Sequence, residues 1–166
     1  MYSVGEYIVH PGQGVCEVVN VSDSPQAVYE LLPVGQRHPV HISFPVASES
    51  RLRPVLSRDE AEEIFAEYPT MEVEDFHARN NALEEEHFKD ELRTGTCRDS
   101  VRIAKTFRVR IASLSARNKK PPVSYERILK MARERSDMEL AVALGCTTEE
   151  VDERFEALMG DDERAS

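Results

Sequence analysis

The chain has 166 residues, of which 40% are hydrophobic and 31% charged, and its formal net charge is -10. That length fits one ordinary domain or two small ones, and no apolar run approaches the roughly 18 residues that a membrane-spanning helix needs. An acidic surface repels phosphate, so the overall charge argues against a protein that coats nucleic acid.

The charge is distributed unevenly along the chain. Residues 59–91, here called the acidic segment, carry a net charge of -11, and residues 98–135, the basic segment, carry +9. Residues 136–166 are acidic again, with a net charge of -8. Two interpretations stay open: the basic segment contacts a phosphate backbone, or its charges decorate solvated helix faces and pair within the protein.

Residues 1–56 contain short runs of β-forming residues separated by Gly, Pro, Ser and Asp. The clearest runs are 15–21, 27–34 and 39–46. Prolines stand at the ends of the runs, where a missing N–H costs least. This spacing predicts a small antiparallel β-barrel over residues 1–56.

The stretch VGEYIVHPGQGVCEVVNV, residues 4–21, places two valine-rich runs around a turn that contains Gly12 and Gly14. A phosphate-binding loop would need a third glycine, a lysine and a following helix, and these are missing from the pattern. The glycines therefore predict a tight turn that needs a positive φ.

After residue 56 the pattern becomes helical. Ser57 and Glu60 form a capping-box pattern at the start of a first helix. A second helix is predicted over residues 73–92, with an apolar stripe that Asn80 and Asn81 interrupt.

Thr96 and Asp99 predict the start of a third helix that is amphipathic. Its apolar face is opposite a basic stripe formed by Arg98, Arg102 and Lys105. This stripe is the core of the basic segment, so it is the first candidate for contact with phosphate.

A fourth helix is predicted to be capped by Ser124 and to continue or restart before Gly145. The last helix is predicted to begin at Thr147. Together these elements predict an all-α domain of about five helices over residues 57–159, followed by a disordered tail at 160–166. The fold class is therefore α+β in two domains.

The sequence offers no recognisable catalytic constellation. We find no nucleophile paired with a base, no metal-ligand spacing and no paired carboxylates in an apolar site. Glu84, Glu85 and Glu86 form a charge run that we expect to face water. We therefore expect no enzyme activity, no cofactor and no metal; a small enzyme dependent on His38 or His41 is the least favoured alternative.

The opening stretch resembles the N-terminal signature of the CarD/CdnL family of bacterial transcription regulators. That signature runs valine, glycine, acid, β-formers, an aromatic, and then Pro-x-x-Gly. The matching positions are Val4, Gly5, Glu6, Ile8, Val9, Pro11 and Gly14, with His10 where the family usually has tyrosine. Weaker similarity continues through Phe44-Pro45, Arg53 and the sequence LRTGT at 92–96.

The resemblance implies that the barrel over residues 1–56 is Tudor-like, or SH3-like, and that it binds the protrusion (β1) lobe of the RNA polymerase β subunit. In that family an exposed edge strand of the barrel pairs with a strand of the polymerase. The residues that this implies for the contact are Val15, Val18, Val21, Tyr29, Ile42, Phe44 and Arg53.

The resemblance also implies that the helical domain lies against promoter DNA at the upstream edge of the bubble. Basic side chains there contact phosphates, and a tryptophan enters the minor groove. This chain has no tryptophan, and counting back from Gly95 places the position of the wedge near Asn81. The candidates for DNA contact are Asn81, Arg98, Arg102, Lys105, Arg108, Arg110, Lys119 and Lys120.

The leading prediction is thus a monomeric regulator that binds RNA polymerase and modulates initiation, with its basic segment as a candidate for contact with upstream-fork DNA. We expect no membrane association. Because the first residues contain neither a basic start nor an apolar leader, we expect a bacterial cytoplasmic protein, associated with the nucleoid through the polymerase. The alternative is an acidic polymerase-binding adaptor that does not bind DNA and that recruits or blocks another protein.

Overall fold

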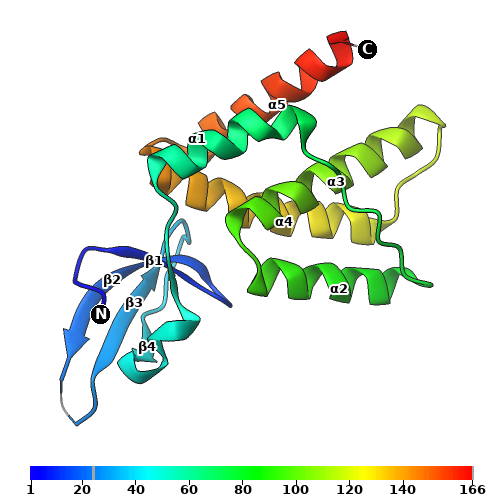
Figure 1. Cartoon of the computed structure of the whole chain (residues 1–166). Coiled ribbons are helices and arrows are strands. Elements are labelled where there is room, and N and C mark those ends of the chain that lie inside the picture. The colour runs from blue at the N-terminus through cyan, green and yellow to red at the C-terminus, as the bar shows by residue number, and fades with distance from the viewer. Residues whose placement is uncertain (24, 166) are drawn as a thin grey trace. The chain divides into compact units, whose positions relative to one another are not determined.

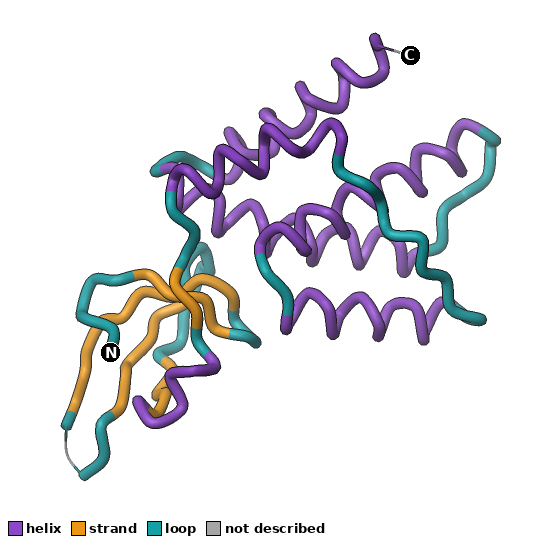
Figure 2. Tube along the Cα trace, viewed as in Figure 1, coloured by secondary structure: helices purple, strands orange, loops and turns teal. Residues whose placement is uncertain are grey.

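Figure 1 shows the chain as a computed structural model, which describes residues 1–23 and 25–165, with side chains as far as Met159. The chain divides into two compact units, Met1–Leu56 and Ser57–Ser166. All strands belong to the first unit and all α-helices to the second (Figure 2). The predicted α+β class, a sheet followed by helices, is confirmed.

One antiparallel sheet makes up most of the first unit. Its strands are β1 (Tyr7–His10), β2 (Gly14–Ser22), β3 (Val28–Pro33), β4 (Ile42–Pro45) and β5 (Arg53–Pro54). They lie in the order β4-β3-β2-β1-β5, and the 3₁₀-helix η1 (Val46–Arg51) connects β4 to β5. β2 and β3 therefore have a neighbour on each side, whereas β4 and β5 are the outermost strands.

The turn between β1 and β2 is held by its own residues. Gly14 pairs with His10 across the hairpin and has a φ of +75°. The backbone N–H groups of Gly12 and Gln13 donate to Nδ1 of His10 at 3.0 and 3.1 Å. A side chain at position 14 would be strained at this φ, so the predicted positive-φ turn is confirmed at Gly14.

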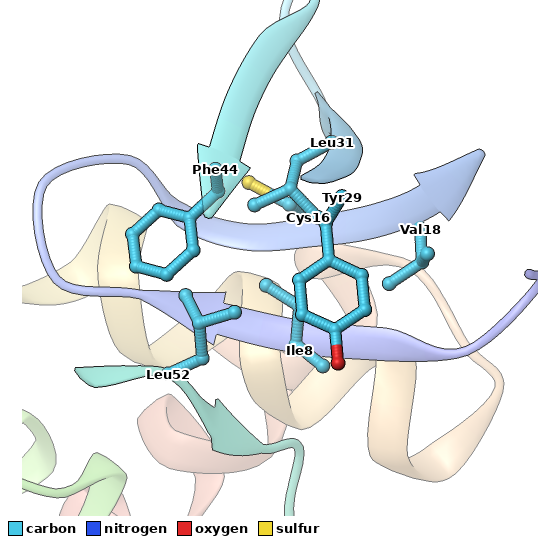
Figure 3. Close-up of a cluster of buried hydrophobic side chains, with 7 residues drawn as sticks. All are labelled: Ile8, Cys16, Val18, Tyr29, Leu31, Phe44 and Leu52. Carbon is cyan, nitrogen blue, oxygen red and sulfur yellow. The ribbon is translucent and has the colours of Figure 1, made fainter. Parts of the chain in front are cut away.

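The core of the first unit lies on one face of the sheet. Figure 3 shows its buried side chains, which are Ile8, Cys16, Val18, Tyr29, Leu31, Phe44 and Leu52. Residues alternate between buried and half-buried along β3, as expected for a strand with one face toward a core. The hydroxyl of Tyr29 donates to Glu49 at 2.6 Å, which satisfies the buried phenol.

The second unit begins with the predicted capping box. In α1 (Arg58–Glu67), the Ser57 hydroxyl accepts from the N–H of Glu60, and the Glu60 carboxylate accepts from the N–H of Ser57. The 3₁₀-helix η2 (Tyr68–Thr70) follows α1 directly. The first helix is therefore predicted correctly from local sequence.

The predicted second helix is wrong in its first part. Residues 71–80 form an irregular connection, and α2 spans Asn81–Thr94. The side chain of Asn80 accepts from the N–H of Leu83 at 2.9 Å. Asparagine is among the best N-cap residues, so the asparagines that interrupt the apolar stripe mark the start of the helix.

α3 (Cys97–Ala116) begins at the capping box of Thr96 and Asp99, as predicted. α4 (Val123–Leu144) is one continuous helix that begins after Pro122 and ends at Gly145, whose φ is +68°. The predicted cap at Ser124 is wrong, because Ser124 is the second residue of α4 and Pro122 occupies the N-cap position, where no side chain caps the helix.

α5 (Thr148–Ala165) follows a short turn after α4. The Thr147 hydroxyl accepts from the N–H of Glu150 at 3.1 Å, as the sequence predicts. The backbone of α5 continues through 160–165, where the sequence predicts a disordered tail; the side chains of that segment and all of Ser166 lie outside the described residues.

Two apolar clusters hold the helices together. The first joins α2, α3 and α4 through Phe88, Leu92, Ile103, Ala104, Phe107, Ile128 and Ala132. The second joins α1, η2 and α5, where the rings of Phe65 and Tyr68 lie 4.6 and 4.7 Å from the ring of Phe155. Within the described residues, no helix is both long and apolar enough to cross a membrane.

We expect Thr96→Ala to lower the free energy of unfolding by about 1 kcal/mol, because it removes the cap of α3. The measurement is urea unfolding of the full chain, followed by helical circular dichroism. Thr94→Ala is the matched control: its hydroxyl donates to the Asp90 carbonyl and caps no helix start. Equal losses in the two variants would contradict the capping role.

Candidate functional site

One exposed edge of the sheet is formed by β4. The N–H of Val46 donates to the carbonyl of Ala27 at 3.0 Å. Because backbone groups alternate in direction along a strand, Ser43 and Pro45 direct theirs away from β3. Both residues are exposed, and Pro45 occupies an outward position where an N–H is not needed for the ladder. The N–H and C=O of Ser43 are therefore oriented to pair with a further strand.

The residues predicted for polymerase contact are mostly core residues. Val15, Val18, Tyr29 and Phe44 are buried, and Val21 and Ile42 are half-buried and pack against the same core. Arg53 is half-buried in β5, opposite Val9. The core side chains cannot reach a partner, so they would support such a contact only by shaping the sheet.

Lys105 is a structural residue. Its side chain is 6% exposed, and its Nζ donates to the carbonyls of Tyr68 at 2.6 Å, Pro69 at 3.3 Å and Met71 at 2.8 Å. A cation at the C-terminal end of a helix satisfies carbonyls that have no partner within the helix. The predicted place of Lys105 on an exposed basic stripe is therefore wrong, because the segment around η2 covers it.

Arg110 is also directed into the protein. Its guanidinium donates to the carbonyls of Glu74 at 3.1 Å and Phe76 at 2.7 Å, and it pairs with the carboxylate of Glu84 at 2.9 Å. It also lies 5.0 Å from the centre of the Phe107 ring. Arg110 thus connects α3 to the irregular connection and to α2, and it does not present its charge to solvent.

Arg108 joins α3 to the other side of the unit. It donates to the hydroxyl of Tyr68 at 3.0 Å and to the carboxylate of Asp152 at 3.0 Å. The side chains of Arg108 and Asp152 are 16% and 20% exposed. A pair this well covered resists displacement by an outside phosphate, because breaking it would leave a charge poorly solvated.

Arg98 and Arg102 lie nearer to solvent. Arg98 pairs with Glu67 at 2.7 Å, and both side chains are about half exposed. Arg102 lies 3.9 Å from Glu74 and 3.5 Å from Asp99. An exposed pair such as Arg98–Glu67 contributes only about 0–1 kcal/mol, so Arg98 can exchange its partner at low cost. Arg102 is more covered, with 28% of its side chain exposed.

The remaining candidates for DNA contact are exposed. Asn81 is the first residue of α2, and Lys119 and Lys120 lie in the connection between α3 and α4. Asn118, next to the lysines, has a φ of +55°. Figure 1 shows the start of α2 and this connection at the same end of the helical unit. The structure thus brings these three residues to one end and directs Lys105, Arg108 and Arg110 elsewhere.

Pairing within the protein, one of the two interpretations of the basic segment, is found for several of its cations, although the sequence did not indicate which carboxylates are their partners. Glu84 and Glu85 are 3% and 8% exposed, so the prediction that they face water is wrong. Arg127 binds both carboxylate oxygens of Glu85 at 2.9 Å, which keeps the pKa of Glu85 below its usual value. The opposite net charges of the acidic and basic segments were the signal for this pairing.

A cavity of about 480 Å³ lies among α1, α4 and α5. Arg154 donates to both carboxylate oxygens of Glu62 on its wall, at 3.2 and 2.8 Å. Burial raises the pKa of the Cys146 thiol, which also lines the cavity, so this thiol is protonated at neutral pH and is a weak nucleophile. In the described part of the chain, no group of three His, Cys, Asp or Glu side chains is placed to hold a metal.

Comparison with known proteins assigns no family to the chain. A scan against protein-family models and a search of curated protein sequences found no match. The resemblance of residues 4–18 to the CarD/CdnL signature therefore depends on those residues themselves.

We expect Lys105→Met to lower the free energy of unfolding by about 2–4 kcal/mol, because it leaves buried carbonyls without a donor. Lys119→Met is the matched control, since Lys119 is exposed, and we expect a change within about 0.5 kcal/mol. Both values come from urea unfolding of the full chain. Similar stabilities for the two variants would mean that Lys105 does not hold the segment around η2.

Proposed function

We propose that this chain is an RNA-polymerase-binding transcription regulator of the CarD/CdnL type, which modulates initiation without catalysing a reaction. In this proposal Met1–Leu56 is a Tudor-like barrel domain, the helical unit is a second domain, and the protein acts as a monomer in the bacterial cytoplasm. Support comes from the signature at 4–18, which forms the β1–β2 hairpin, and from the order of a sheet followed by helices.

The observation that carries the proposal is the exposed edge at β4. An added strand needs a neighbour whose outward N–H and C=O groups have no strand beside them. Of the three runs considered for this contact, β2 and β3 lie inside the sheet and β4 is outermost. We therefore assign the contact with the protrusion lobe of the polymerase β subunit to β4, with Ser43 as its central backbone partner.

We expect Ser43→Pro to weaken binding to an isolated β-protrusion fragment by about tenfold, because it removes one outward backbone donor and its hydrogen bond. Ser43→Ala keeps that donor and should bind as the unchanged chain does. Binding is measured by isothermal titration calorimetry with the full chain. Circular dichroism of each variant checks that the sheet persists, as expected, because the Ser43 N–H does not serve the ladder with β3. Equal affinities for the two variants would contradict pairing at β4.

For the helical unit, the pairing of charges favours the adaptor function over contact with DNA. Lys105, Arg108 and Arg110 donate to groups of the protein, and Arg127 binds Glu85. Neutralised cations release few counterions on DNA, and counterion release supplies much of DNA affinity. We therefore propose that the helical unit recruits or blocks another protein near the promoter.

A second candidate function, contact with promoter DNA, is supported only by the exposed end of the unit. Lys119 and Lys120 are exposed in the connection between α3 and α4, and Asn81 is exposed at the start of α2. Figure 1 shows both segments at the same end of the helical unit. An asparagine can hydrogen-bond a base edge but cannot unstack a base step as a large aromatic side chain does. Contact of this kind would neutralise few phosphates and would be correspondingly weak.

The adaptor function predicts no measurable affinity of the full chain for fork-junction promoter DNA, even at about 50 mM salt, because few cations remain for phosphates. Fluorescence anisotropy over a salt series makes the measurement. Binding with a log–log salt slope of about -2, abolished by the double change Lys119→Gln and Lys120→Gln, would instead establish the DNA function. Lys130→Gln, at another exposed lysine, is the matched control for charge.

A further inference from the structure

A partly buried group of charges joins α5 to the rest of the helical unit. Asp152 of α5 accepts from Arg108 of α3 at 3.0 Å and from Arg133 of α4 at 2.5 Å. Arg108 also donates to the hydroxyl of Tyr68 in η2. Asp152 is therefore the carboxylate through which α5 binds two neighbouring helices.

A second carboxylate, Asp137, lies in the same group. It is 6% exposed, and its Oδ1 has no hydrogen-bond partner among the described residues. Burial is the main reason that the pKa of Asp137 rises to about 6, and the negative charge of Asp152 raises it further. Arg108 and Arg133 act in the opposite direction, because their positive charges favour the ionised form.

The charged and titratable groups that act on Asp137 come from several elements. They are Tyr68 of η2, Arg108 of α3, Arg133 and Ser136 of α4 itself, and Asp152 of α5. Lys105, another cation of α3, is engaged by the carbonyls around η2. Ionised Asp137 thus competes with Asp152 for the same two arginines and repels it at the same time.

Apolar contacts add to the hold on α5. Phe155 packs against Phe65 and Tyr68, and Val151 is fully buried. The guanidinium of Arg108 lies 5.7 Å from the centre of the Phe155 ring. A change in the charges around Arg108 therefore affects the same contact region in which the apolar face of α5 packs.

We propose that the docking of α5 is proton-dependent: protonation of Asp137 strengthens the hold of α5 on α3 and α4, and ionisation weakens it. The inference concerns the helical unit alone and is independent of the proposed binding to polymerase. Opening of α5 would uncover the apolar side chains of Phe65 and Tyr68, so the group links the exposure of an apolar surface to pH.

The direction follows from linkage. The docked state binds the Asp137 proton more tightly than an opened state does, because opening brings water to the carboxyl and separates it from Asp152. The stabilising contribution is therefore fully present in acid and is lost as the pH rises through about 6. Docking should weaken between pH 5 and 7.5.

Hydrogen exchange of the full chain tests the proposal. After correction for intrinsic rates, we expect the opening equilibrium reported by the amides of residues 151–158 to rise about five- to tenfold between pH 5 and 7.5. Asp137→Asn should abolish this rise. Glu134→Gln, which removes an exposed carboxylate from the same helix, should leave the rise unchanged.

The two histidines of the helical unit lie beside α2, where His77 faces Glu84 and His87 faces Glu91. They are present in the unchanged chain and in both variants, so the comparison isolates Asp137. An α5 protection that does not vary with pH, or that varies equally in Asp137→Asn, would overturn the proposal. A carbon NMR titration of the unchanged chain adds a direct test, because a midpoint near 4 for the Asp137 carboxyl would also overturn it.

Discussion

The helical unit depends on the cations of α3 that satisfy an irregular stretch of backbone. The connection at 71–80 has neither helix nor strand to pair its N–H and C=O groups. Lys105 donates to carbonyls just before the connection and at its first residue, and Arg110 donates to two carbonyls within it. The hydroxyl of Thr106 accepts from the N–H of Glu74 at 2.8 Å. Burial of these cations is tolerable because they are hydrogen-bonded in this way, so the same side chains stabilise the connection and anchor it to α3.

This use of the cations limits what the basic segment can do at a surface. A lysine or arginine whose N–H donors already bind carbonyls or carboxylates adds little to the affinity for a phosphate. This holds even where the net charge of the segment is strongly positive. The exposed cations at the α3–α4 connection are few, and Arg98 and Arg102 already have carboxylate neighbours. The net charge of the basic segment therefore overstates the positive charge that the helical unit offers to a phosphate.

Local sequence predicted helix starts such as those at Ser57 and Thr96 correctly, but it did not predict which charged side chains are buried or what they bind. Ser57 and Thr96 begin helices through bonds to residues three positions later, so a short window of sequence contains all the information. The false start at residue 73 arose because apolar residues near Phe76 imitate a helical stripe. Those residues belong to a connection that α3 stabilises, which no local window can reveal.

The sequence by itself determined the sheet-then-helix order, the positive-φ turn at Gly14 and most of the helix caps, because each depends on neighbouring residues. Only the tertiary structure decided which strand is an edge and which charges are buried. The bonds of Lys105 to Tyr68 and of Arg108 to Asp152 join residues 37 and 44 positions apart. The free energy of a buried charge depends on the hydrogen-bond and ionic partners around it. Packing brings those partners from distant parts of the chain, so the residues adjacent in sequence do not reveal them.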